Sequence, residues 1–249
     1  MTAWPSLSLA PVTVVSLYVF MDFNPMRFDR RSTLKIAASG IVAATSGVGF
    51  GLLSAGAAQA TVSFPAATRG IFDLYQGKRP IGQHRYEITG SQNAPNVLTQ
   101  AAFEGRALGF SARYELTTQE QWQSGLLWQL RSQGRFRSDA FQMSAQRQGD
   151  ALLVTNDKDE VRPVTPNIFP TTYWMPNFVE QRAVLDTQRG DVWEINPTYL
   201  GEGSFHGTAV RGWKLDGELG LSIYYDLNNS WAGLQFRVLG SNFEYRRVG

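Results

Sequence analysis

Short stretches in which apolar and polar residues alternate recur along the chain after residue 70. Examples are residues 71–75, 112–116, 192–195, 221–225 and 234–238, which are rich in aromatic and β-branched side chains. An alternation with a period of two is typical of β-strands that bury one face. Turn residues such as Gly77-Lys78, Gly149-Asp150 and Asp216-Gly217 separate these stretches. Roughly ten to twelve strands at intervals of about 8–12 residues are therefore expected, which is the pattern of an antiparallel sandwich, barrel or curled meander.

One segment departs from the alternation. Between residues 171 and 188, Trp174, Phe178 and Leu185 recur near helical spacing, and Gly190 follows as a stop signal. We predict an all-β fold, built as a single antiparallel, strongly curved sheet or an open β-barrel. A short helical segment near residues 171–188 should plug or flank the sheet.

The first 60 residues have the features of a leader. From Met26 a basic region that contains Arg30 and Arg31 is followed by a weakly apolar stretch and by the small residues Ala58 and Ala60 around Gln59. These features are typical of a secretory signal peptide, and the arginine pair resembles the twin-arginine export signal. The alternative, an uncleaved membrane anchor, is disfavoured because five glycines would weaken the helix.

This interpretation divides the chain into three parts. Residues 1–25 are an over-extended start, residues 26–60 are the signal peptide, and residues 61–249 form a single β-rich domain in the periplasm or outside the cell. No stable membrane span is expected after cleavage.

Charge and cysteine content narrow the function classes. Four of the 23 Lys and Arg residues and two of the 21 Asp and Glu residues precede Thr61, which leaves 19 of each in the domain. A balanced domain is not expected to bind nucleic acid or an anionic membrane surface. The chain has no cysteine, which excludes disulfides, cysteine-ligated metals and a cysteine nucleophile. We find no residue pattern dedicated to a cofactor or a metal, and we predict neither.

The candidate ligand-binding residues lie on predicted strand faces. Alternation places His84 and Tyr86 on one face of their strand and Glu120 and Trp122 on one face of another. His84 has the chemistry of a general base or a metal ligand, but the alternative is a structural histidine hydrogen-bonded within the sheet. Glu120 beside a tryptophan has the environment of a carboxyl with a raised pKa. The alternative for Glu120 is an ion pair with an arginine such as Arg113, Arg131 or Arg135.

Aromatic residues are the other indication of function. Of the 31 Phe, Trp and Tyr residues, 25 follow Ala60. They can line an apolar binding floor or fill a curled core. Trp128 and Trp174 join Trp122 as the tryptophans of first interest, and alternation predicts that Trp128 faces the same side as Leu126 and Leu130.

Several ordered signatures resemble a domain-of-unknown-function family of small exported bacterial proteins. The matching pieces are Phe72-Asp73-Leu74-Tyr75-x-Gly77-Lys78, Ile81-Gly82-x-His84-Arg85, Glu120-x-Trp122-x-x-Gly125-Leu126, Tyr173-Trp174, Leu185-x-Thr187-Gln188-x-Gly190, Tyr225-Asp226 with Trp231, and Tyr245-Arg246. The resemblance implies a β-rich, curled or incomplete barrel, similar to the periplasmic lipoprotein carriers, and it implies no activity. Leu116 and Gly134 depart from the family's usual residues.

Three hypotheses of function follow. The first is a non-enzymatic envelope protein that binds an apolar or amphipathic ligand in the concave face of the sheet. The second is a partner-binding or assembly module of the envelope that uses an exposed sheet edge. The third is a hydrolase or isomerase that uses His84 and Glu120, which requires the two side chains to lie near hydrogen-bond reach of each other.

Overall fold

The computed structural model describes residues 64–107, 110–238 and 240–249. The predicted export signal, with Arg30, Arg31, Ala58 and Ala60, and the predicted start at Met26 lie outside these residues. No described helix is long and apolar enough to cross a bilayer.

The described chain forms one 15-stranded sheet. Its strands are β1 (Arg69–Gln76), β2 (Arg79–Ser91), β3 (Ala94–Ala107), β4 (Phe110–Gln123), β5 (Leu126–Phe136), β6 (Asp139–Gln148), β7 (Ala151–Thr155), β8 (Val161–Val164), β9 (Phe169–Pro170), β10 (Ala183–Leu185), β11 (Val192–Phe205), β12 (Thr208–Gly217), β13 (Leu221–Asp226), β14 (Trp231–Val238) and β15 (Ser241–Arg247). The count exceeds the ten to twelve strands expected, because β8, β9 and β10 have only two to four residues and are too short to show alternation.

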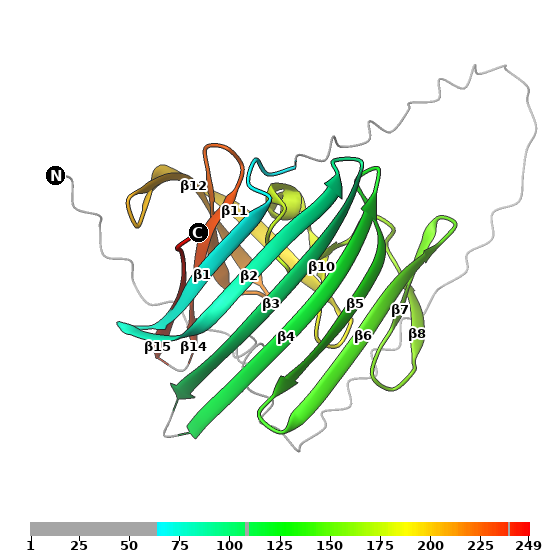
Figure 1. Cartoon of the computed structure of the whole chain (residues 1–249), viewed down its shortest axis with the longest axis horizontal. Helices are drawn as coiled ribbons and strands as arrows, with labels where there is room; N and C mark the ends of the chain where they lie inside the picture. The colour runs from blue at the N-terminus through cyan, green and yellow to red at the C-terminus, as the bar shows by residue number, and fades with distance from the viewer. Residues whose placement is uncertain (1–63, 108–109, 239) are drawn as a thin grey trace, which may run out of the picture.

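The order of strands explains the curled shape. The sheet runs β8-β7-β6-β5-β4-β3-β2-β1-β15-β14-β13-β12-β11-β10-β9. Neighbouring strands pair antiparallel except β9 and β10, which are parallel. The two edge strands, β8 and β9, are consecutive in the sequence and are joined by residues 165–168. The sheet therefore curls into an open barrel (Figure 1), as predicted.

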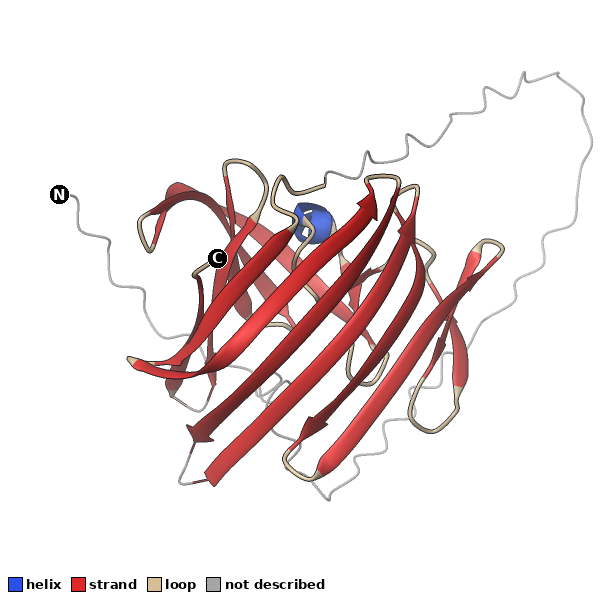
Figure 2. Ribbon diagram, in the orientation of Figure 1, coloured by secondary structure: helices blue, strands red, loops and turns tan. Residues whose placement is uncertain are grey.

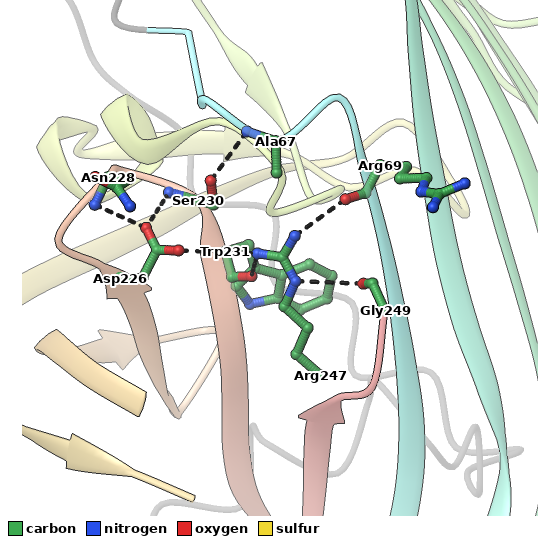
Figure 3. A network of polar contacts seen from close by, with 8 residues as sticks. All are labelled: Ala67, Arg69, Asp226, Asn228, Ser230, Trp231, Arg247 and Gly249. Carbon is green, nitrogen blue, oxygen red and sulfur yellow. Dashed lines mark hydrogen bonds and ion pairs between the residues drawn. The ribbon is translucent and has the colours of Figure 1, made fainter. Parts of the chain in front are cut away.

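The first and last strands meet inside the sheet, where β1 pairs with β15. Arg247 fastens this seam (Figure 3) by donating hydrogen bonds to the carbonyl oxygens of Arg69 at 3.1 Å, Trp231 at 3.3 Å and Gly249 at 3.3 Å. Its guanidinium lies 3.9 Å from the Asp226 carboxylate. Asp226 in turn accepts the backbone N–H of Ser230 at 2.8 Å, which orders the β13–β14 turn. One side chain thus joins both ends of the domain.

Residues 165–191, here called the plug segment, include the helix that is visible near the upper ends of β1 and β2 in Figure 1. The helix in this segment, coloured blue in Figure 2, is a 3-10 helix over Pro176–Glu180. The predicted helical segment is therefore present, but it is shorter than residues 171–188, and β9 and β10 flank it. The plug segment packs against the inner face of the sheet, where the Trp122 ring makes a tilted contact with Phe169 and an edge-to-face contact with Trp174, at centroid distances of 5.4 and 5.7 Å.

Two local predictions were wrong for reasons of register. The pairing of β4 with β5 shifts between Gln121 and Trp122, so that Trp122 is opposite Leu127 and Gln121 is opposite Gln129. This β-bulge leaves Trp128 unpaired and turns it outward, with 42% of its surface exposed, whereas Leu130 is fully buried. The predicted Asp216-Gly217 turn is also displaced, because Gly217 still pairs with β11 and the chain turns after it.

Candidate functional site

The face assignments made for β2 and β4 are confirmed. His84 and Tyr86 are 4% and 2% exposed, while Gln83, Arg85 and Glu87 point outward. Glu120 and Trp122 are 1% and 3% exposed. All four predicted candidates on these strands, together with Trp174 from the plug segment, lie on the inner face of the sheet.

His84 lies in an aromatic cage rather than in a polar network. Its ring makes edge contacts with Phe72, Trp231 and Tyr245 at centroid distances of 6.2, 5.0 and 5.5 Å. The Nε2 atom is buried and has no hydrogen-bond partner among the described residues. Burial lowers the pKa of His84 to about 3, so the imidazole is neutral at physiological pH. Tyr86 lies beside this cage, and burial raises the pKa of its phenol to about 12.

Glu120 joins the sheet to the plug segment. Its Oε2 atom accepts hydrogen bonds from the indole N–H groups of Trp122, at 2.8 Å, and of Trp174, at 3.1 Å. Burial raises the pKa of the Glu120 carboxyl to about 7, although these two hydrogen bonds and one from Thr172 oppose the rise. The predicted alternative, an ion pair with an arginine, was wrong, because Glu120 faces the interior whereas Arg113, Arg131 and Arg135 are exposed on the other face.

A second buried carboxyl lies within the plug segment. Asp186 is 2% exposed and accepts the backbone N–H of Arg189 at 2.8 Å. Burial raises its pKa to about 6. Nearby, the Ser132 hydroxyl of β5 donates to the carbonyl oxygen of Thr187. The Ser132 contact fastens the plug segment to the inner face, and no local sequence pattern indicates it.

The structure does not bring His84 and Glu120 together. His84 is opposite Ala101, which is opposite Leu116, so Glu120 lies four residues further along and two strands away. Strands spaced about 4.8 Å apart with a rise of about 3.3 Å per residue put the two Cα atoms about 16 Å apart. This separation exceeds the reach of a general acid–base pair. Within the described residues, no group of three or more His, Cys, Asp or Glu side chains is arranged to hold a metal ion.

Large buried side chains cover much of the inner face that the structure describes. A cavity inside the barrel, lined by Tyr114, Tyr173, Tyr245 and neighbouring apolar residues, has a volume of about 50 Å³. Drug-sized ligands occupy sites of about 300–1,000 Å³. Many rings on the predicted concave floor, among them Trp122, Trp174 and Trp231, are buried and pack against one another or against the plug segment.

The opposite, outward face carries a much larger depression. A hollow of about 920 Å³ crosses β2 to β6, and a second of about 440 Å³ adjoins it across β4 to β7. The two hollows share Thr117, Gln133 and Gln142, and we call them together the outer groove. Residues of the β7–β8 turn, among them Asp157 and Asp159, form one wall. Figure 1 looks onto this face of β2 to β6.

Sheet register explains how the outer groove is lined. Cross-strand pairs place Arg85, Gln100, Thr117, Gln133 and Gln142 in one row over five strands. The next row contains Gln83, Ala102, Glu115, Arg135 and Ala140. Small side chains open the floor, since Ala102 and Ala140 stand among longer residues. The backbone of Leu116 and Gly134, the two departures from the family pattern, also lines this hollow.

The free sheet edge is less suited to binding. Among the described strands, β8 is the exposed edge, with Val161 at 61% exposure. It has four residues, and Pro163 offers no N–H group. The Arg162 guanidinium forms an ion pair with the Asp191 carboxylate at 2.8 Å and donates a hydrogen bond to the carbonyl oxygen of Gly190. These contacts link the β8 edge to the β10–β11 loop.

These features define an open, barrel-like and mostly antiparallel sheet with a plug segment against its inner face and a polar outer groove. Residues 72–248 match the family model described as "Domain of unknown function (DUF6134)", and the chain belongs to this family. Among curated proteins, none matches the sequence. Among solved structures, the chain is similar to the beta-barrel-like protein of domain of unknown function DUF1849 from Brucella abortus, with a TM-score of 0.48 and 11% identity over 75% of this chain and 97% of that chain.

Proposed function

We propose that the protein is a non-enzymatic binding protein of the cell envelope, and that it holds an amphipathic ligand in the outer groove. The observation that carries the proposal is the volume of the larger outer hollow, about 920 Å³, against about 50 Å³ for the cavity lined by Tyr114, Tyr173 and Tyr245. Ligand sites of about 300–1,000 Å³ are usual, and they combine apolar surface with a few polar groups. The twin-arginine-type leader supports the assignment to the envelope.

The lining of the groove suits a ligand of mixed polarity. Ala102 and Ala140 contribute carbon surface, while glutamines and arginines stand between them. The role needs no reacting group, in keeping with the separation of His84 from Glu120.

A ligand under the plug segment is disfavoured on energetic grounds. Displacing the segment exposes Ile168, Trp174, Phe178, Val184 and Leu185, each of which is at most 1% exposed. At about 1.5–3 kcal/mol for each large apolar side chain, the cost is roughly 10 kcal/mol. That figure is comparable with the whole stability of a domain, about 5–15 kcal/mol. A ligand that displaced the plug segment would have to offset this cost, which favours the outer groove as the proposed site.

Native mass spectrometry of the protein purified from the cell envelope tests the proposal, with a denatured sample beside it. We expect an additional mass that is lost on denaturation. Thr117→Trp, at the junction of the two hollows, should abolish this additional mass. Gln121→Trp is the matched control, because Gln121 is exposed on the same strand and face but lines neither hollow. A bare mass for the native protein, or a ligand retained by Thr117→Trp, would contradict the proposal and favour the partner-binding alternative.

A further inference from the structure

The outer groove is electrically balanced. Its charged lining residues are three arginines and three acids, namely Arg85, Arg131, Arg135, Glu115, Asp157 and Asp159. Two of these charged groups already have a partner within the protein. Arg85 donates from Nε and Nη2 to the Gln100 side chain at 2.9 and 2.6 Å, and Glu115 lies 2.6 Å from Arg113. A ligand with a net charge would meet as much repulsion as attraction along this surface.

The groove is also unusually rich in side-chain amides. Five glutamines line it, Gln83, Gln100, Gln119, Gln133 and Gln142, together with the hydroxyl groups of Thr117, Ser144 and Thr155. Each amide carries both a donor and an acceptor, as does each hydroxyl. Such a surface complements ligand groups that donate and accept at the same atom, and the group with this property in a neutral ligand is the hydroxyl.

The direction of the groove is the third observation. The rows cross β2 to β6 at right angles to the strands, a distance of about 19 Å for five strands about 4.8 Å apart. An extended peptide that joins a sheet pairs along an edge strand through its backbone. A ligand that crosses the face contacts only side chains, so its recognition depends on groups distributed along its length.

We propose that the polar part of the ligand is a neutral, polyhydroxylated group of the sugar type. The inference rests on the proposed function and specifies the chemistry of the same site. The side-chain amides of Gln133 and Gln142, at the junction of the two hollows, bind its hydroxyl groups, and the small floor residues accept its carbon faces. A glycolipid head group and a free oligosaccharide share this chemistry.

Calorimetric titration of the purified full-length protein separates the head groups. The probes are dodecyl maltoside, dodecylphosphocholine and dodecanoate, each below its micelle concentration, and maltotetraose. We expect dodecyl maltoside to bind at least about tenfold more tightly than the two charged-group amphiphiles, which corresponds to about 1.4 kcal/mol. Raising the salt from about 50 to about 500 mM should change this affinity by less than about twofold, because a neutral ligand is not screened.

The outcomes distinguish the inference from the proposed function. Equal binding of all three amphiphiles, or binding that weakens strongly with salt, overturns the sugar assignment and leaves the amphipathic site standing. Binding of none of them overturns both. Binding of maltotetraose as tight as that of dodecyl maltoside identifies a free oligosaccharide as the source and contradicts the amphipathic part of the proposed function.

Two further variants locate the recognition. Gln133→Leu keeps the approximate size of the side chain but removes its amide, and it should weaken dodecyl maltoside binding about tenfold. Gln121→Leu, outside the groove on β4, should leave the affinity unchanged. Arg135→Gln should also change it by less than about threefold, since a neutral ligand does not depend on one cation. A loss of binding in Arg135→Gln larger than in Gln133→Leu would overturn the inference in favour of an anionic ligand.

Discussion

Replacing Glu120 by glutamine should make the protein's stability less dependent on pH. The carboxyl is 1% exposed, and its neighbours are indole N–H groups rather than a cation. Burial raises its pKa from an ordinary value near 4.5 to about 7, which corresponds to about 3 kcal/mol. Because the folded state binds the proton more tightly than the unfolded state does, this carboxyl lowers stability as the pH rises from about 4.5 to about 7.

The glutamine variant has no charge to bury, and its amide oxygen can accept the same indole hydrogen bonds. We therefore compare the free energy of unfolding of the variant with that of the unmutated protein. The difference between them, variant minus unmutated, should rise by roughly 3 kcal/mol between about pH 4.5 and about pH 8. Asp186 and His84 also titrate in this range, but they are present in both proteins and cancel in the comparison.

Urea unfolding of the two proteins at both pH values gives this difference. Any penalty for glutamine amide N–H groups that lack a partner is the same at both pH values. It therefore cancels when the stability differences at the two pH values are compared. Trp174→Phe is a useful companion, because it removes one donor to the carboxylate and should destabilise the protein more at about pH 8 than at about pH 4.5. If Glu120→Gln shifts stability by the same amount at both pH values, Glu120 is not a buried carboxyl that prefers its neutral form, and the reasoning is refuted.

Three further predictions concern the packing of the sheet. In the folded protein the pKa of the His84 imidazole is lowered to about 3, so the protein loses stability as the pH falls below about 6.5. His84→Phe should remove this loss. Acid unfolding monitored by circular dichroism checks the prediction, and an unchanged acid transition would count against it. Trp122→Ala should cost about 3–5 kcal/mol in chemical unfolding, and Trp128→Ala less than about 1 kcal/mol, since only the first ring is buried; similar costs would argue against the β-bulge. Gly134→Ala should lower the melting temperature, because a Cβ there would lie 2.4 Å from the Phe141 ring and 2.2 Å from the Glu115 carbonyl oxygen; an unaltered melting temperature would mean that the strands are more loosely packed.

The sequence predicted the fold class because the alternation is a local signal. The inward positions of His84 and Glu120 follow from a period of two within one strand, and the structure agrees with them. Trp128 is the exception that shows the limit of this reasoning. A β-bulge opposite Trp122 shifts the inward and outward alternation of β5 by one residue. No feature of residues 126–130 taken alone indicates this bulge.

The hydrogen-bond partners of the buried polar groups could not be predicted, because they are brought together by packing between distant parts of the sequence. Trp174 lies 54 residues from Glu120 in the sequence, so an arginine was as reasonable a partner for the carboxylate as an indole. The outer groove was missed for a similar reason. Its residues can be recognised in the sequence as outward-facing polar positions, but their arrangement in rows requires the register of five strands. The signal that was present is the number of glutamines at these outward positions.

The most direct test of ligand binding in the outer groove is a nuclear magnetic resonance titration of the protein with monomeric dodecyl maltoside. Side-chain amide resonances of glutamine report on the groove, and aromatic resonances of Tyr114, Tyr173 and Tyr245 report on the interior cavity. We expect the shifts to concentrate at Gln133, Gln142 and the adjoining strands, and the resonances of the three tyrosines to be unaffected. Shifts confined to the tyrosines and the plug segment would contradict it, because they would mean that the ligand enters the barrel.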